Sequence, residues 1–284
     1  MSSQPIPALS VVIMTYNEES NLPRCLEAVK WSNDIVVLDS FSTDRTVEIA
    51  KAAGARVYQR AFDNEASQRT YSLRELSFKY PWIYNPDADE EPTPELCREM
   101  LAVVQDTQAK AVAYRMRFKT MFMGKWIRFS SLYPTWVIRL FRPEKIQLER
   151  SVNLSYVVKG LEGKLASHFL HFAFSNGFDA WFTKHNRYSH YEALETLKSL
   201  RQGFNGWGDL LNFSDSARRR QALKQLSFRL PCRPTLRFLY MYLVRGGILD
   251  GRPGFRYCRL LSIYEYMISL KINELRRKQR GLTL

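Results

Sequence analysis

The sequence predicts an α/β protein with an open, mostly parallel sheet flanked by helices, followed by a basic helical C-terminal region. Three observations carry this prediction. Short apolar runs alternate with amphipathic stretches over the first hundred residues, polar residues gather where those runs end, and the positive charge is concentrated near the C-terminus.

The first strand is expected at Leu9–Met14, because a continuous apolar run is typical of a strand buried on both faces of a parallel sheet. A helix should follow, since Ser20 and Asn21 offer N-cap side chains and Pro23 suits a first helical turn. Its apolar stripe repeats at helical spacing and consists of Leu22, Cys25, Leu26 and Val29.

Three more strands are expected at Ile35–Leu38, Arg56–Gln59 and Trp82–Tyr84. A helix that begins at Ser42 or Thr43 and ends at Gly54 separates the first two, and a helix over Glu65–Phe78 separates the next two. The resulting order βαβαβαβ is typical of an open, mostly parallel sheet covered on both faces.

The pattern changes after Pro94. A helix is expected at Glu95–Val104, and later aromatic residues from Phe178 to Tyr188 recur at helical spacing. Further strands are expected at Ala111–Phe118, Val137–Phe141 and His168–Phe174. The glycine-containing stretch Gln202–Ser216 is typical of a linker or loop, so we expect an α/β domain at 1–200 and a separate helical region at 201–284.

The net charge of +14 lies almost wholly in the last 84 residues, which hold 17 Lys and Arg against 5 Asp and Glu. Two amphipathic stretches, Leu236–Leu249 and Leu260–Ile272, mix arginines with aromatic and aliphatic residues. Residues 216–284 are therefore expected to contact an anionic membrane surface, the alternatives being a solvated basic face or a helical hairpin packed on the core. Nucleic acid is not an expected partner, because no recognised DNA- or RNA-binding module is present.

The remaining composition points to the cytoplasm. Four widely separated cysteines form no CxxC pair and indicate reduced thiols rather than a disulfide framework. The N-terminus lacks the features of a signal peptide, and no apolar run approaches the roughly 18–20 residues that span a bilayer. We expect a cytoplasmic protein, peripheral on the inner face of the membrane.

Three polar clusters follow predicted strands: Thr15–Glu18, Asp39–Ser40 and Asn85–Glu90. In open α/β sheets, ligands bind beyond the carboxyl ends of the strands, so the clusters predict one site. Asp87 and Asp89 place two carboxylates in the third cluster, as suits Mg²⁺ or Mn²⁺ bridging to a diphosphate. There is neither a GxGxxG nor a GxxxxGK[ST] motif, which argues against a dinucleotide-binding domain and a P-loop NTPase. A lone DxD is more often an exposed acidic loop, so the prediction depends on all three clusters.

The segments SVVIMTYNEESNLPRCLEAV, DIVVLDSFSTDRTVEIAKAAGARVY and NPDADEE occur in this order. Together they resemble family 2 glycosyltransferases of the GT-A fold, and more narrowly the lipopolysaccharide core β-1,4-glucosyltransferase branch. The resemblance is strong over residues 9–100. It continues more weakly through GKWIR, LYP, RLFR, LHFAF and NRYS.

The resemblance implies a site for a nucleoside-diphosphate sugar, with a UDP-sugar as the expected donor. The residues implied to contact the donor are Thr15, Tyr16, Asn17, Glu18, Asp39, Ser40, Gln68, Arg69, Asp87 and Ala88. Asp89 is implied as the more direct metal ligand, with Asp87 and His171 beside it. For His171 a satisfied core histidine is the alternative, and for Asp44, in the same DSxSTD pattern, a helix cap.

Two departures concern the acceptor side. The branch carries a Val-His-Glu segment where this sequence has Val152-Asn153-Leu154, and the Glu-Asp pair of many family 2 enzymes is not evident. Inverting transfer needs a carboxylate base, for which Glu149 and Glu162 are the candidates. The departures predict an acceptor other than that of the core glucosyltransferases. From the three polar clusters and the basic C-terminal region we expect a metal-dependent inverting transferase with a lipid-linked or envelope-glycan acceptor. The alternatives are a degenerate GT-A protein that binds a nucleotide sugar or a partner without turnover, and an anionic-surface adaptor.

Overall fold

The computed structural model describes residues 9–149, 155–201, 207–210, 215–230 and 232–284. Two compact units make up the chain: Met1–Trp126 with Tyr133–Asn176, and Ile127–Leu132 with Gly177–Leu284. The segment Val152–Leu154 and most of the predicted linker lie outside the described residues.

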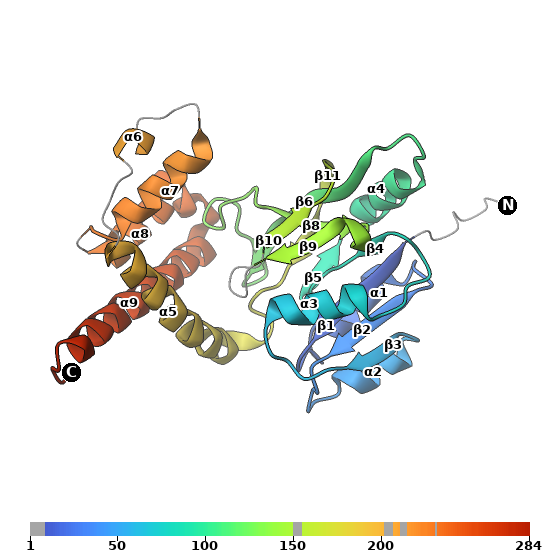
Figure 1. Ribbon diagram of the computed structural model, residues 1–284, viewed down its shortest axis with the longest axis horizontal. Helices are drawn as coiled ribbons and strands as arrows, with labels where there is room; N and C mark the ends of the chain where they lie inside the picture. The colour runs from blue at the N-terminus through green and yellow to red at the C-terminus, as the bar shows by residue number, and fades with distance from the viewer. Residues whose placement is uncertain (1–8, 150–154, 202–206, 211–214, 231) are drawn as a thin grey trace. The chain divides into compact units, whose positions relative to one another are not determined.

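One mixed sheet organises the first unit (Figure 1). Its strands are ordered β3-β2-β1-β4-β8-β6-β11-β5, with β7 paired to β6. Strands β5, β7 and β8 are antiparallel to the strands they pair with, and all the other strands of the sheet run in one direction. The strands are β1 Ser10–Thr15, β2 Ile35–Asp39, β3 Arg56–Gln59, β4 Ile83–Tyr84, β5 Glu90–Pro92, β6 Ala111–Phe122, β7 Lys125–Trp126, β8 Trp136–Phe141 and β11 Leu161–His171. The predicted open, mostly parallel α/β sheet is confirmed.

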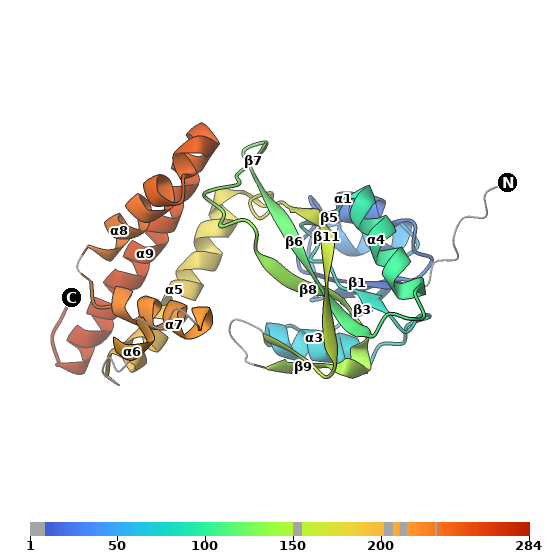
Figure 2. The ribbon, with the colours of Figure 1, turned by 90° about the horizontal axis from the view of Figure 1, so that it is seen from above.

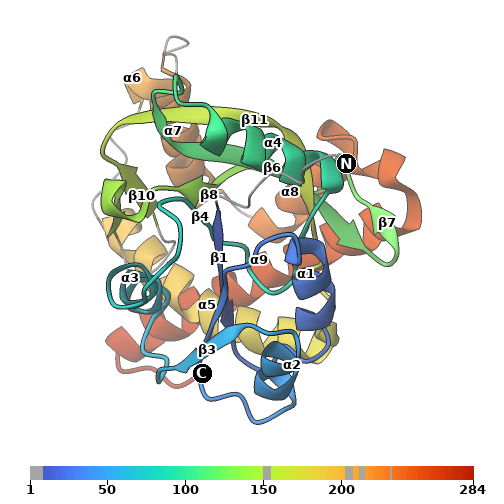
Figure 3. The ribbon, with the colours of Figure 1, turned by 90° about the vertical axis from the view of Figure 1, so that its right-hand side faces the viewer.

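Helices cover both faces of this sheet. Helices α1 (Leu22–Val29) and α2 (Thr46–Ala52) lie on one side of β1, and α3 (Glu65–Arg74) lies on the other (Figure 3). Helix α4 (Pro94–Gln105) packs with α1 against the same apolar layer. Alternation along the strands explains the two layers, since Val11 and Ile13 face the α1 side while Val12 faces the α3 side.

A two-stranded ribbon adds to the α3 side of the sheet. Strand β9 (Ile146–Glu149) follows the short 3₁₀ turn η1 (Pro143–Lys145) and pairs with β10 (Ser155–Val158). Leu148 and Tyr156 pack with the apolar residues below α3, and Arg74 donates a hydrogen bond to the carbonyl oxygen of Ile146 at 3.0 Å. The ribbon therefore runs alongside α3, the helix that carries Gln68 and Arg69.

The second unit is helical. Its elements are α5 Gly177–Arg201, α6 Trp207–Leu210, α7 Ser216–Ser227, α8 Arg233–Leu239, the π turn η2 Tyr240–Val244, the 3₁₀ turn η3 Gly247–Asp250 and α9 Gly251–Gln279. Helix α5 packs on α9 through Ala193, Leu197, Ile268 and Ile272. Helix α8 lies antiparallel to α9 (Figure 2), with Arg233 paired to Glu265 at 2.8 Å.

The division between the two units falls at Asn176, rather than at the residue 200 that we expected from the sequence. The physical reason is that α5 buries its apolar residues against α9 and so joins the C-terminal helices. Within the described residues, no helix combines the length and the apolarity needed to cross a membrane.

Candidate functional site

Two strand ends form the first part of the site. Thr15 and Asp39 are paired in register at the carboxyl ends of β1 and β2. The buried Asp39 carboxylate accepts hydrogen bonds from Thr15 Oγ1 at 2.9 Å, from the Ser42 backbone N–H at 2.9 Å and from Gln59 Nε2 at 3.2 Å. The contact between Asp39 and a base or ribose stays a prediction. It requires an N–H or O–H group of the nucleoside to replace one of these hydrogen-bond donors.

The loops after β1 and β2 are tied together. The backbone N–H of Asn17 donates to Ser42 Oγ at 2.8 Å, its side-chain oxygen accepts from the Thr43 N–H at 2.8 Å, and the Glu18 N–H donates to Thr46 Oγ1 at 2.8 Å. Asn17 has a φ of 54°, a conformation that asparagine adopts more readily than most residues. These hydrogen bonds fix the edge of the site, where the neighbouring Tyr16 is 60% exposed.

Asp44 forms local hydrogen bonds just before α2, but the N-cap position of that helix is Arg45, so the helix-cap alternative for Asp44 stays a prediction. Its carboxylate accepts from the Thr46 N–H at 3.0 Å at the start of α2 and from the Glu19 N–H at 3.1 Å. These hydrogen bonds lower the pKa of Asp44, against the opposing effect of burial. Asp44 therefore joins the same two loops.

Helix α3 buries polar side chains toward this edge of the sheet. Gln68 Nε2 donates to Ser40 Oγ at 3.1 Å, which links α3 to the end of β2. Arg69 is buried, and its nitrogens donate to Glu65 at 3.2 Å, Asn85 at 2.7 Å and Asp87 at 2.6 Å. With every guanidinium nitrogen engaged, Arg69 supports the DxD segment, and its expected contact with donor phosphates stays a prediction.

The DxD segment connects β4 to β5 above a buried ionic cluster. Asp87 Oδ1 accepts a hydrogen bond from Arg69 Nη2 at 2.6 Å, and Asp87 Oδ2 accepts one from Arg139 Nη2 at 2.5 Å. Arg139 also contacts Glu90 at 2.6 Å. Burial alone would raise the pKa of Asp87, but Arg139 and Arg69 hold it below its usual range. Burial raises the pKa of Glu90 to about 7, against the opposing effect of Arg139.

Asp89 and His171 form the third part of the site. Antiparallel pairing of β11 with β5 places His171 opposite Glu90, and the Phe172 N–H donates to the Asp89 carbonyl oxygen at 2.9 Å. His171 Nε2 lies 3.4 Å from Asp89 Oδ2, and both side chains are partly exposed. Burial lowers the pKa of His171, but the hydrogen bond and negative charge of Asp89 outweigh it, so the pKa is raised.

The structure separates the two candidate bases. Glu162 lies near the start of β11, nine residues before His171, and is paired with Arg115 at 2.5 Å. At about 3.3 Å per residue this places it roughly 30 Å from His171 along the strand, so Glu162 is not part of this site. Glu149 is exposed at the end of β9. The residue before it, Leu148, pairs with Tyr156 of β10. Tyr156 lies close enough to Arg69 and Arg139 to raise the pKa of both, so this end of the ribbon is near the site.

Arg139 is the site residue that the sequence reasoning missed. It is 8% exposed and occupies the fourth position of the otherwise apolar strand WVIRLF. A charged residue inside a buried strand requires a partner of opposite charge, so the position of Arg139 could have indicated a buried ion pair near the strand ends. Asn85 was included only as part of its cluster, yet it accepts from Arg69 and donates to the Val12 carbonyl oxygen at 2.7 Å.

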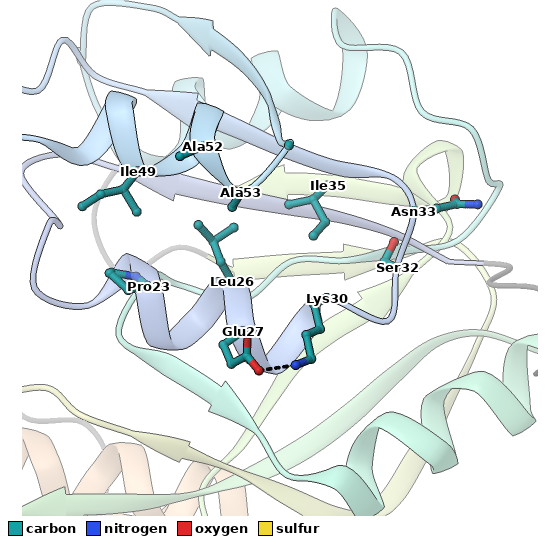
Figure 4. Close-up of a pocket in the computed structure, with 11 residues that line it drawn as sticks. Pro23, Leu26, Glu27, Lys30, Ser32, Asn33, Ile35, Ile49, Ala52 and Ala53 are labelled. Atoms are coloured by element: carbon teal, nitrogen blue, oxygen red, sulfur yellow. Dashed lines mark hydrogen bonds and ion pairs between the residues drawn. The ribbon is translucent and has the colours of Figure 1, made fainter.

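A surface hollow lies elsewhere, between α1 and α2 (Figure 4). Leu26, Ile35, Ile49 and Ala53 line it, and Glu27 and Lys30 pair at its rim. None of the residues of the three polar clusters lines this hollow, so it is separate from the candidate site.

Comparison with known sequences gives matches over much of the chain. The sequence model described as "Glycosyl transferase family 2" matches residues 10–160. An uncharacterized glycosyltransferase of Rickettsia typhi is 26% identical over 96% of this chain and 89% of its own. A lipopolysaccharide core biosynthesis glycosyltransferase of Rhizobium meliloti is 27% identical over 93% and 91%.

Comparison with solved structures gives more distant similarity. The glucosyl-3-phosphoglycerate synthase of Mycobacterium tuberculosis, in complex with Mn²⁺ and UDP-glucose, is 21% identical over 40% of this chain, with a TM-score of 0.35. The chain spans less than half the length of that structure, 44%.

Proposed function

The chain belongs to glycosyl transferase family 2 and is a glycosyltransferase, and on this premise we propose that it is a metal-dependent, inverting enzyme. Its donor is a nucleoside-diphosphate sugar, with a UDP-sugar as the expected form. The observation that carries the proposal is that the three polar clusters lie at one edge of the sheet, joined through Ser40–Gln68 and Arg69–Asp87.

The residues present fit a Mg²⁺ or Mn²⁺ ion. Asp89 supplies a carboxylate oxygen and His171 an imidazole nitrogen, 3.4 Å apart and accessible to solvent. Within the described part of the chain, no three His, Cys, Asp or Glu residues form a complete metal site, as expected where substrate phosphates provide further ligands. A bound ion would neutralise charge on the leaving diphosphate.

Asp87 is not assigned as a metal ligand in this proposal. Each of its carboxylate oxygens already accepts from a guanidinium group, so binding a metal ion through either oxygen would weaken the contact with Arg69 or Arg139. Asp87 instead holds the segment that presents Asp89. Tyr16 and Asn17 border the nucleoside side, and Glu18 lies next to Asn176, whose Nδ2 donates to it at 3.2 Å.

The proposed base is Glu149, which takes the proton from the acceptor hydroxyl as that oxygen attacks the anomeric carbon. Its place at the end of the β9–β10 ribbon, next to α3, supports this choice over Glu162. The relative named for lipopolysaccharide core biosynthesis supports a lipid-linked or envelope-glycan acceptor. We place the enzyme in the cytoplasm, peripheral on the membrane, which it contacts through residues 216–284.

A thermal-shift screen of nucleotide sugars, with and without Mn²⁺, tests the donor assignment. A ligand that binds only the folded state raises Tm by mass action, so a donor should raise Tm in the presence of Mn²⁺ and less in EDTA. No shift with any nucleotide sugar would contradict the proposal. Donor binding with neither hydrolysis nor transfer to lipid extracts would favour the non-catalytic alternative.

A further inference from the structure

The turn between α8 and α9 exposes a group of aliphatic side chains. Leu243 is 55% exposed, Val244 75%, Ile248 51% and Leu249 66%, all within seven consecutive residues. We call these four residues the apolar apex. Single exposed aliphatic residues are ordinary, but a contiguous group of this kind marks an interaction surface.

The apolar apex is held by a defined turn. The buried Asp250 carboxylate accepts from the backbone N–H groups of Arg128, Phe129 and Ser130 at 2.8–3.0 Å. Gly246 has a φ of 77°, and a Cβ on Gly247 would lie 2.7 Å from the Met241 carbonyl oxygen. The backbone thus fixes the turn in a form that directs these aliphatic side chains to solvent.

Arginines surround the apolar apex almost without counter-charge. Between residues 228 and 264 there are seven arginines, no lysine and one acidic residue, the buried Asp250, and of these arginines Arg233 is paired with Glu265. Within the described residues Arg245, Arg252 and Arg259 are exposed and have no carboxylate partner. Guanidinium groups bind phosphate through two parallel N–H donors, so this surface is complementary to phosphate-bearing partners.

A shallow hollow at the start of α9 is lined by both arginine and aromatic side chains. Arg252 and Arg256 line it together with Tyr242, Gly251 and Phe255. The rings of Tyr242 and Phe255 meet edge to face at 5.6 Å. The hollow therefore places the Arg252 side chain beside an aromatic pair, next to the apolar apex.

We propose that the apolar apex inserts into an anionic lipid bilayer, with Arg245, Arg252 and Arg259 at the level of the headgroup phosphates. This inference deepens the proposed membrane association and rests on it. A second copy of this chain would bring like charges together, and a nucleic acid would leave the aliphatic side chains in water. A bilayer with anionic headgroups satisfies both the apolar and the basic parts of the surface.

The first test measures sedimentation of the full chain with vesicles of phosphatidylglycerol and phosphatidylcholine, without nucleotide. Val244→Ser with Leu249→Ser should weaken binding about tenfold, whereas Leu161→Ser with Leu282→Ser, at comparably exposed sites, should change it less than about twofold. Equal binding by wild type and the Val244 and Leu249 variant would overturn the proposal.

Charge-reversal variants distinguish vesicle binding through the apolar apex from binding through the positive charge of the whole C-terminal region. Arg245→Glu with Arg252→Glu should weaken binding roughly tenfold or more, since each arginine near an anionic surface contributes about fivefold. The matched control, Arg276→Glu with Arg280→Glu, changes the net charge equally at the other end of α9. Equal losses in the two variants would contradict insertion at the apex.

A fluorescence measurement reports insertion itself. An environment-sensitive dye on Val244→Cys, in a Cys232→Ser background that removes the exposed cysteine, should shift to the blue with anionic vesicles. The same dye on Leu161→Cys should not shift, and an unshifted Val244 probe would refute insertion. Binding of a UDP-sugar with Mn²⁺ in vesicle-free buffer tests the proposed function separately, so failure of one measurement does not imply failure of the other.

Discussion

Replacing Arg139 by methionine tests the buried cluster beneath the DxD segment. The methionine side chain fills a similar volume, but the change removes the contacts to Asp87 at 2.5 Å and to Glu90 at 2.6 Å. Breaking a buried ion pair from one side typically costs about 3–5 kcal/mol, because the other charge stays buried without a partner. Arg69 still holds Asp87, so we expect about 3–4 kcal/mol of lost unfolding free energy near pH 8.

The loss should be smaller at pH 6 than at pH 8. Burial already raises the pKa of Glu90 to about 7, and losing Arg139 raises it further. A carboxyl whose pKa is higher in the folded than in the unfolded state contributes stability that is present below the unfolded pKa and lost as pH rises through the folded pKa. At pH 6 Glu90 can bind a proton instead of remaining an unpaired buried anion.

The assay is urea denaturation of metal-free protein in EDTA at both pH values, followed by circular dichroism and tryptophan fluorescence. Arg98→Met is the control, since Arg98 forms an exposed pair with Glu95 and should cost less than about 1 kcal/mol. A loss below about 1 kcal/mol for Arg139→Met at pH 8, or a greater loss at pH 6 than at pH 8, would refute the reasoning.

Three other changes probe separate parts of the chain. Asp34→Asn should lower stability by about 2 kcal/mol at pH 7, because Asp34 accepts from Ser10, Arg56 and the Lys79 N–H. These contacts lower the pKa of Asp34 despite burial, so the difference should vanish as pH falls below 3.8 in denaturation curves, and a constant difference would contradict this. Asp250→Ala should cost about 2–4 kcal/mol and speed hydrogen exchange at residues 128–130, and unchanged exchange would argue against its bracing role. Glu149→Gln should reduce kcat at least about 100-fold while Glu162→Gln changes it less than about threefold, and the reverse order would exclude Glu149 as the base.

Much of the donor half was predictable because local and tertiary signals agree there. The run at Val11–Met14 is apolar because both faces of β1 are covered, and Arg56–Gln59 is a strand as expected. Helix α3 is shorter than expected, ending at Arg74 instead of Phe78. Three of its four buried residues are polar, namely Gln68, Arg69 and Ser72, and Leu73 is the fourth, so an apolar stripe could not define its length.

Other features depend on pairing between distant segments. Strand β5 is only three residues long, Glu90–Pro92, and exists because it pairs with the end of β11. The expected strand at His168–Phe174 instead covers Leu161–His171, whose first half alternates little in hydrophobicity but pairs with β6. Proximity of His171 to Asp89 follows from this pairing, which is why the resemblance and not the local pattern suggested it.

The most direct test of the central claim is calorimetric titration of the donor found by thermal shift into wild type, Asp89→Asn and His171→Ala. We predict that Mn²⁺ strengthens donor binding to wild type at least about tenfold relative to EDTA. Both variants should lose that gain. Asp89→Asn should keep close to the wild-type Tm because Asp89 is partly exposed, whereas His171→Ala also removes a ring that packs on Phe118 and should lower Tm. Retention of the full Mn²⁺-dependent gain in both variants would contradict a metal-assisted donor site at this edge of the sheet.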